Sequence, residues 1–191
     1  MLNIVIFGAP GSGKGTQSDK IIAEYGVEHI STGDVLRAEI KGGTELGKTA
    51  AAYINEGKLV PDSLIIDILA STLDAKGKDI KGVIFDGFPR TIAQAEALNA
   101  MLAERGQSVS TVIGLEVDDE ELIKRIIARG KTSGRADDNE ETAKKRLNTY
   151  YSQTLPLKDF YIAEGKYAKI DGVGSIDDIY ACIKKAIDAV K

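Results

Sequence analysis

Residues 8–16 read Gly-Ala-Pro-Gly-Ser-Gly-Lys-Gly-Thr, and this stretch decides the fold. The apolar, β-branched run Leu2–Phe7 before it predicts a buried strand, and the segment Lys14–Tyr25 after it predicts a helix. A glycine-rich turn between strand and helix lets several backbone N–H groups point at one anion, because no side chain blocks their approach. Lys14 adds a positive charge for β- and γ-phosphates, and the Thr16 hydroxyl can reach Mg²⁺ or a phosphate. The loop therefore predicts a triphosphate site.

The composition is that of a soluble globular protein with one domain. The 191 residues are 43% apolar and 28% charged, which is enough for a substantial core. The net charge of −4 argues against a nucleic-acid-binding protein, which would be basic. No basic leader precedes the first strand, and no apolar run approaches the ~20 residues that span a membrane. The expected location is the cytoplasm. The single cysteine, Cys182, lies in an apolar helical pattern and is expected to be a buried structural thiol.

Strand and helix patterns alternate along the chain. The strand-like segments are Leu2–Phe7, Glu28–Ile30, Val83–Asp86, Thr111–Val117 and Tyr167–Ile170. Helical patterns lie between them, with starts at Pro61-Asp62, Asp118, Asp138 and Ser175. This order predicts an α/β protein with a parallel sheet covered on both faces.

Two segments interrupt this alternation. Residues 31–60 contain short helical pieces separated by glycines, and residues 128–138 are rich in Gly, Arg and Asp. Polar excursions flanked by glycine on a rigid α/β core are lids or ordinary surface loops, and composition does not choose between these two readings.

Arginines and one carboxylate form the second chemical signal. Guanidinium groups match phosphate oxygens, although any single arginine could be a solvated surface residue. The arginines near glycine-rich turns or within the polar stretch 124–146 are Arg37, Arg90, Arg125, Arg129, Arg135 and Arg146.

Asp86 ends a predicted strand, where it could hold Mg²⁺ through water or cap the next helix. Asp137 and Asp138 could support the same ion, with Asp138 favoured as a helix cap. The single histidine, His29, is interpreted as a strand residue rather than a catalyst.

Four motifs together carry a resemblance to a known family. They are the loop 8–16, in which Gly15 follows the lysine and the hydroxyl comes one residue later, Ser31-Thr32-Gly33-Asp34, Asp86-Gly87-Phe88-Pro89-Arg90, and residues 132–139, Thr-Ser-Gly-Arg-Ala-Asp-Asp-Asn. In this order they resemble the nucleoside monophosphate kinases, and among these the adenylate kinases with a short lid. The resemblance covers essentially the whole chain.

The resemblance implies a fold and a division of the chain. The fold would be the three-layer phosphate-loop (P-loop) NTPase fold, with a five-stranded parallel sheet, helices on both faces and small AMP-binding and lid insertions. Residues 1–30, 61–127 and 139–191 would form the core. Residues 31–60 would be the AMP-binding flap and residues 128–138 the lid. Closure of both would keep water from the γ-phosphate, so lid opening is a plausible limit on turnover.

The resemblance also implies roles for individual residues. The ATP side would comprise Gly11, Ser12, Gly13, Lys14, Gly15, Thr16, Arg125, Arg129 and Gly174. The AMP side would comprise Thr32, Arg37, Lys58, Leu59, Val60, Gly87, Phe88, Pro89, Arg90 and Gln94, together with Arg135 and Arg146. Catalysis would rest on Lys14, Arg90, Arg129, Arg135 and Arg146, with Asp86 holding Mg²⁺ through water.

These implications describe an enzyme that converts ATP and AMP reversibly into two ADP with Mg²⁺. The lid lacks cysteines, so no zinc is expected, and the expected partners are ATP, AMP and ADP, bound by a monomer without nucleic acid or membrane. The nearest alternative is a UMP/CMP kinase, which tends to have alanine at position 32 and asparagine at position 94. A GTP-binding switch would need an Asn-Lys-x-Asp guanine motif, which the sequence lacks. A non-catalytic nucleotide sensor would have no use for so many arginines.

Overall fold

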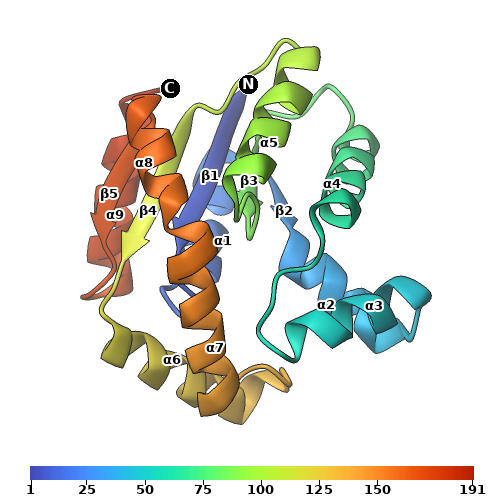
Figure 1. Cartoon of the computed structure of the whole chain (residues 1–191). Coiled ribbons are helices and arrows are strands. Elements are labelled where there is room, and N and C mark those ends of the chain that lie inside the picture. The colour runs from blue at the N-terminus through green and yellow to red at the C-terminus, as the bar shows by residue number, and fades with distance from the viewer.

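A computed structural model describes all residues, 1–191. Five parallel strands form one sheet: β1 (Leu2–Gly8), β2 (Glu28–Ser31), β3 (Gly82–Asp86), β4 (Thr111–Glu116) and β5 (Tyr167–Asp171). Their order is β2-β3-β1-β4-β5, so the phosphate loop after β1 lies at the centre of the sheet (Figure 1). Each predicted strand is present, with bounds that differ by one residue at most.

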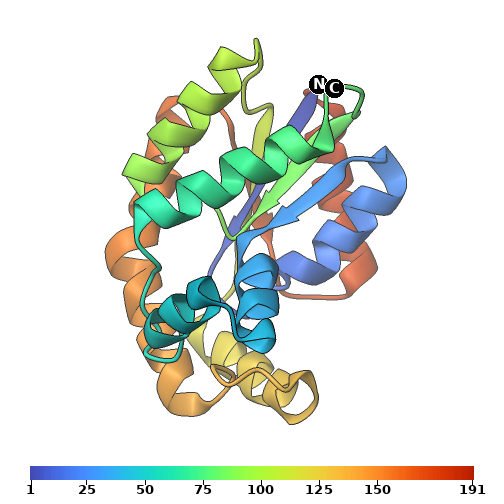
Figure 2. The same cartoon turned by 90° about the vertical axis from the view of Figure 1, so that its right-hand side faces the viewer.

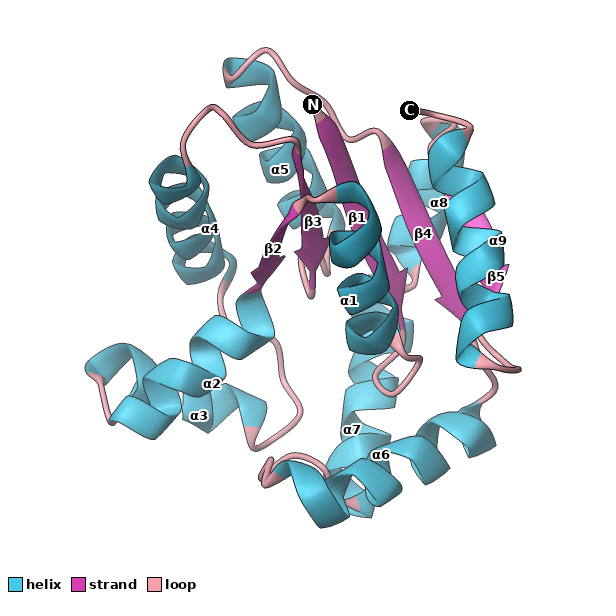
Figure 3. Ribbon diagram, turned by 180° about the vertical axis from the view of Figure 1, so that it is seen from behind, coloured by secondary structure: helices cyan, strands magenta, loops and turns pink.

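Helices cover both faces of the sheet because the strand side chains alternate in direction. On one face, side chains such as Ile4 and Ile6 pack against α1 (Lys14–Tyr25) and α9 (Ile176–Asp188), which lie in front of the sheet in Figure 3. On the other face, Val5 and Phe7 pack among residues of α4 (Asp62–Lys76), α5 (Ile92–Glu104) and α8 (Pro156–Ala163). The predicted three-layer α/β fold is confirmed.

The remaining helices lie beyond the carboxyl ends of the strands. α2 (Thr32–Gly42) and α3 (Glu45–Ile54) form one helical pair. A second pair comprises α6 (Asp119–Ser133) and α7 (Glu140–Thr149), and a π-helical turn, η1 (Tyr150–Thr154), joins α7 to α8. Figure 2 shows both pairs at the end of the molecule opposite the two termini. None of the helices is both long and apolar enough to cross a bilayer.

Two of the predicted side-chain caps are present, at the starts of α6 and α9. The Asp118 carboxylate accepts from the Glu121 N–H, and the Ser175 hydroxyl accepts from the Asp178 N–H. The predicted cap at Asp138 is wrong, because Asn139 occupies the cap position of α7 and accepts from the Thr142 N–H. Asp138 is therefore free to pair with arginines.

The predicted burial of Cys182 is also wrong. The cysteine is exposed, while Ile179, Ile183 and Ile187 form the buried face of α9. Residues one position apart differ by about 100° around a helix, so Cys182 next to Ile183 points to the solvent side.

Candidate active site

Two glycines give the phosphate loop its shape. Gly11 and Gly13 have φ angles of 83° and 96°, a region that residues with a Cβ rarely adopt. A Cβ on Gly11 would also lie 2.9 Å from the Leu122 carbonyl oxygen. The loop is therefore packed against α6 and leads directly into the first turn of α1, where free N–H groups favour an anion.

Lys14 is folded back over this loop. Its ammonium donates to the carbonyl oxygens of Gly8 at 3.0 Å and Ala9 at 3.1 Å. Burial lowers the pKa of Lys14 to about 7, and the positive charges of Arg90, Arg146 and Arg129 act in the same direction against the opposing charge of Asp86. A bound phosphate would supply the negative charge that this cluster of cations lacks.

Asp86 ends β3 beside the phosphate loop. Its Oδ2 lies 3.3 Å from Nε2 of His29 on β2. Burial opposes ionisation of the carboxyl, yet the His29 hydrogen bond and the charge of Lys14 outweigh it and lower the pKa of Asp86. His29 is a strand residue, as predicted, and it also orients the Asp86 carboxylate.

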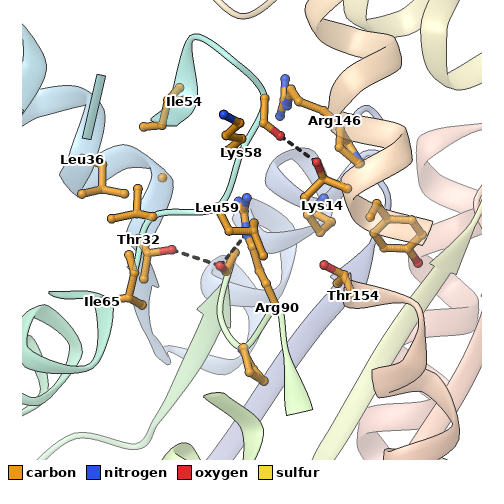
Figure 4. A pocket seen from close by; sticks show the side chains of 18 of the residues that line it. Lys14, Thr32, Leu36, Ile54, Lys58, Leu59, Ile65, Arg90, Arg146 and Thr154 are labelled. Atoms are coloured by element: carbon orange, nitrogen blue, oxygen red, sulfur yellow. Dashed lines mark hydrogen bonds between the residues drawn. The ribbon is translucent and has the colours of Figure 1, made fainter. Parts of the chain in front are cut away.

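A pocket opens in front of the loop and is lined in part by residues of α2, α3 and α7. Five of its lining residues are cationic: Lys14, Arg37, Lys58, Arg90 and Arg146. Apolar residues of the segment 31–60 and of α4 also line it, and Figure 4 shows Leu36, Ile54 and Ile65 across the pocket from Lys14 and Arg146. The pocket thus combines a cationic end with an apolar end, which suits a phosphorylated, flat organic molecule.

The floor of the pocket is built from the end of β3 and the start of α2. The Thr32 hydroxyl donates to the Gly87 carbonyl oxygen at 3.1 Å, and Nε of Arg90 donates to the same oxygen at 2.8 Å (Figure 4). Both Nη groups of Arg90 remain for a ligand. Nη2 of Arg37 donates to Asp34 at 2.6 Å, one helical turn away.

Most of the residues predicted for the AMP side line this pocket. They are Thr32, Arg37, Lys58, Leu59, Val60, Gly87, Pro89, Arg90, Gln94 and Arg146. Phe88 and Arg135 are not among the lining residues. The Phe88 side chain is 1% exposed and packs in the core, so it supports the turn from beneath.

Two buried carboxylates, Asp137 and Asp138, pair with arginines around the loop 134–139. The Asp138 carboxylate accepts from Nε of Arg129 at 2.8 Å and from Nη2 at 2.6 Å, and it also accepts from the Ser133 hydroxyl. Nη1 of Arg146 lies 3.2 Å from Asp137 and 3.4 Å from Asp138. Burial lowers the pKa of Arg146 to about 10, which leaves it charged at neutral pH.

Arg135 lies at the tip of the same loop. Its Nη2 is 3.9 Å from the Asp34 carboxylate on α2, so the loop before α7 and the segment 31–60 meet directly. The segment 128–133 is the last part of α6 rather than a loop, and only residues 134–139 connect α6 to α7.

Two residues predicted for the ATP side, Arg125 and Gly174, lie on the other side of the phosphate loop. Nη2 of Arg125 donates to the Gly172 carbonyl oxygen at 3.0 Å, and its Nε donates to Glu121 at 2.9 Å. Gly174 has a φ of 128° in the exposed turn before α9. Arg125 therefore joins α6 to the turn that holds Gly174.

Several lining residues of the pocket were not predicted from the sequence, among them Thr149, Tyr150 and Thr154. Thr149 and Tyr150 follow Arg146 by three and four positions, so helical spacing from a predicted site residue could have found them. Thr154 lies in η1, and no sequence signal predicts a π-helical turn there.

No group of three or more His, Cys, Asp or Glu side chains in the chain could hold a metal by itself. A single carboxylate, Asp86, beside a phosphate loop fits Mg²⁺, which keeps most of its water and is bound through one or two carboxylates plus phosphate oxygens.

The chain is similar to known proteins of one family. Residues 6–166 match the family model described as "Adenylate kinase". A protein named "Adenylate kinase" from Bacteroides thetaiotaomicron is 69% identical over 188 residues, which are 98% of this chain and 99% of that protein. Proteins of the same name from Bacteroides fragilis and Maricaulis maris are 65% and 48% identical, covering 100% and 98% of this chain and 100% and 99% of their own lengths.

Proposed function

The chain belongs to the adenylate kinase family, and we propose that its large pocket binds AMP while the phosphate loop binds ATP. The protein is an enzyme that transfers the γ-phosphoryl group of ATP to AMP and forms two ADP. Its sheet and helices have the P-loop NTPase architecture of this family. The convergence of Lys14, Arg37, Arg90 and Arg146 on one pocket supports the proposed sites most directly.

ATP occupies the side of the phosphate loop that faces α6. Backbone N–H groups of residues 11–16 bind its phosphates, and Lys14 leaves the Gly8 and Ala9 carbonyls to bind the β- and γ-phosphates. The ATP base lies between Arg125 and the turn at Gly174, which are tied together by the Arg125–Gly172 hydrogen bond.

AMP occupies the pocket. Its phosphate binds Arg37 and the free Nη groups of Arg90, and its base lies against Thr32, Leu59, Val60 and Gln94. Lys58 contributes mainly its backbone to this wall. The apolar end of the pocket thus takes the flat base, while the cationic end takes the phosphate.

Arginines stabilise the transferred group. Phosphoryl transfer spreads negative charge over the moving group, and it needs positioning and charge neutralisation more than a nucleophile on the protein. Arg129, Arg135 and Arg146 enclose the path between the two phosphates, with Arg129 and Arg146 oriented by Asp138. Mg²⁺ accompanies ATP and neutralises part of its charge, and Asp86 would hold the ion through water.

The flap (31–60) and the lid (128–138) close over the core (1–30, 61–127 and 139–191). Closure excludes water, which would otherwise hydrolyse ATP. The net charge of −4 supports a protein whose partners are nucleotides rather than nucleic acid. A cytoplasmic monomer without zinc completes the proposal.

A coupled assay with ATP and Mg²⁺ tests the acceptor, with AMP, CMP, UMP and GMP offered separately. AMP should have the highest kcat/KM, and a higher value for UMP or CMP would overturn the assignment of Thr32 and Gln94.

Two matched variants test the sites. Arg37→Ala should raise KM for AMP, and Arg125→Ala should raise KM for ATP, each by about tenfold. The opposite pattern would exchange the two sites.

A further inference from the structure

The Gln94 side-chain amide is held by two protein groups. Its Nε2 donates to Oδ1 of Asp62 at 2.7 Å, and its Oε1 accepts from the backbone N–H of Arg90 at 2.8 Å. Gln94 is only 2% exposed, yet it lines the pocket. Asp62 is the first residue of α4 and is not among the lining residues.

These two partners allow only one orientation of the amide. A carboxylate offers acceptors alone, and a backbone N–H is a donor alone. If the amide were flipped, Oε1 would face the Asp62 carboxylate and the Nε2 hydrogens would face the Arg90 N–H. Both hydrogen bonds would then be lost. Acceptor would face acceptor at Asp62 and donor would face donor at Arg90 in a buried site, which is strongly unfavourable.

The fixed orientation leaves one pattern for a ligand. One Nε2 hydrogen and one Oε1 lone pair remain, because an amide has two donor hydrogens and two acceptor lone pairs. Adenine presents an N6–H donor next to a ring-nitrogen acceptor on both of its edges, which matches this pattern. A 6-oxopurine has the acceptor O6 in place of the amino group, so it would set an acceptor against Oε1.

We propose that Asp62 is a specificity-determining positioning residue, which locks the Gln94 amide so that the acceptor site takes a 6-aminopurine and rejects a 6-oxopurine. This inference rests on the proposed function in one respect, the location of the AMP base at Gln94. Asp62 does not touch the nucleotide. It acts through the hydrogen bond to Nε2 and makes the flipped amide inaccessible.

A structural role for Asp62 must be separated from this one. Asp62 lies in the first turn of α4, where the preceding residue, Pro61, provides no side-chain cap, so its negative charge also stabilises the helix. Asp67 is an exposed carboxylate on the same helix without a hydrogen bond to Gln94. Asp67→Asn therefore removes one negative charge from α4 without a contact to Gln94 and serves as a control for the loss of charge, while thermal stability reports the effect on the first turn.

Dissociation constants of AMP and inosine 5′-monophosphate test the proposal, because these ligands differ at C6 and N1 alone. They are measured by isothermal titration calorimetry on the full chain. We define the AMP preference as the Kd of inosine 5′-monophosphate divided by the Kd of AMP. In Asp62→Asn this ratio should fall about tenfold, because the asparagine amide can either accept or donate and no longer fixes the orientation of Gln94. Asp62→Ala should give a fall of similar size and serves if Asp62→Asn does not fold. Asp67→Asn should leave the ratio unchanged.

Gln94→Leu tests the placement of the AMP base at Gln94 separately from the role of Asp62. If Gln94→Leu lowers the AMP preference while both Asp62 variants keep the wild-type ratio, the base lies at Gln94 but Asp62 does not orient it, and the inference is overturned. If Gln94→Leu also keeps the wild-type ratio, the placement of the base is wrong as well. Loss of thermal stability with an unchanged ratio would assign Asp62 a structural role only.

Discussion

Arg129 and Asp138 form a bidentate pair, with Nε and Nη2 of the guanidinium 2.8 Å and 2.6 Å from the two carboxylate oxygens. The pair joins the last turn of α6 to the loop before α7, and the Asp138 side chain is fully buried. Because the carboxylate uses both oxygens, the arginine is held in one plane rather than at one point.

Replacement of Asp138 should therefore affect both stability and turnover. Asp138→Ala should lower the free energy of unfolding by about 3 kcal/mol, since it leaves partly buried arginines without their partner. It should also lower kcat, because Arg129 and Arg146 lose their orientation. Urea denaturation and a coupled assay measure the two effects. Unchanged kcat in a folded variant would show that the pair has no part in phosphoryl transfer.

Arg90 offers a test of charge placement. Arg90→Ala should lower kcat by about 10²–10³-fold, because the guanidinium faces the pocket where charge develops in the transition state. Arg90→Lys should recover little of this loss, because an ammonium cannot bind the Gly87 carbonyl and two phosphate oxygens in one plane. Near-normal turnover in the alanine variant, with an unchanged urea midpoint, would contradict the assigned role.

The lowered pKa of Lys14 predicts that the protein takes up a proton when ATP binds. In the ligand-free protein its pKa is about 7, so at pH 8 the amine is mostly neutral, and triphosphate raises the pKa and protonates it. Calorimetry at pH 8 in buffers of different ionisation enthalpy should show uptake of about one proton with ATP and much less with AMP. Equal uptake for the two ligands would contradict this assignment.

The same shift has a consequence for stability without ligand. Between about pH 7 and the unfolded-state pKa of about 10.4, the unfolded chain binds one more proton than the folded chain at Lys14. This group therefore makes the free energy of unfolding rise with pH across that window. Lys14→Met should remove this contribution, and urea denaturation at pH 7 and pH 9 would reveal the difference.

A substitution at Gly130 tests the close contact between α6 and the loop 134–139. A Cβ at this position would lie 2.2 Å from the Asp138 carbonyl oxygen, which is backbone and cannot turn away. Gly130→Ala should cost about 2 kcal/mol of unfolding free energy and lower kcat, because the loop must move off α6. Lys131→Ala, at the exposed neighbouring position, is the control and should change neither quantity strongly.

Removal of the metal should separate activity from folding. A chelator should abolish phosphoryl transfer but leave the Tm of the ligand-free protein unchanged, because no cluster of the chain's own side chains holds a metal. A fall in Tm on chelation would instead indicate a structural ion.

The sequence predicts the elements well where local rules decide them. The strand Leu2–Gly8, the helix from Lys14 and the caps at Asp118 and Ser175 each follow from nearby residues alone. The misassignment of Cys182 has a geometric cause, because a helical pattern of mixed residues leaves the buried face uncertain by one position.

Tertiary contacts decide the other cases. In the sequence, Gly130 suggests the start of a loop, yet α6 continues through it to Ser133. The glycine permits the close approach of the Asp138 backbone rather than a turn. Asp138 looks like a cap, yet Asn139 takes that place and Asp138 pairs with arginines 8 and 9 positions away. The hydrogen bond between Asp62 on α4 and Gln94 on α5 joins residues 32 positions apart in the sequence, and no local sequence pattern predicts it.

Nη2 of Arg135 and the Asp34 carboxylate, 3.9 Å apart, join the loop before α7 to the segment 31–60 without passing through the core. If these segments are the lid and the flap that we propose, each should reach its closed position more readily when the other is already there. We then expect reciprocal coupling, in which ATP tightens the binding of AMP by the same factor by which AMP tightens the binding of ATP. The full transfer geometry would form only when both nucleotides are bound.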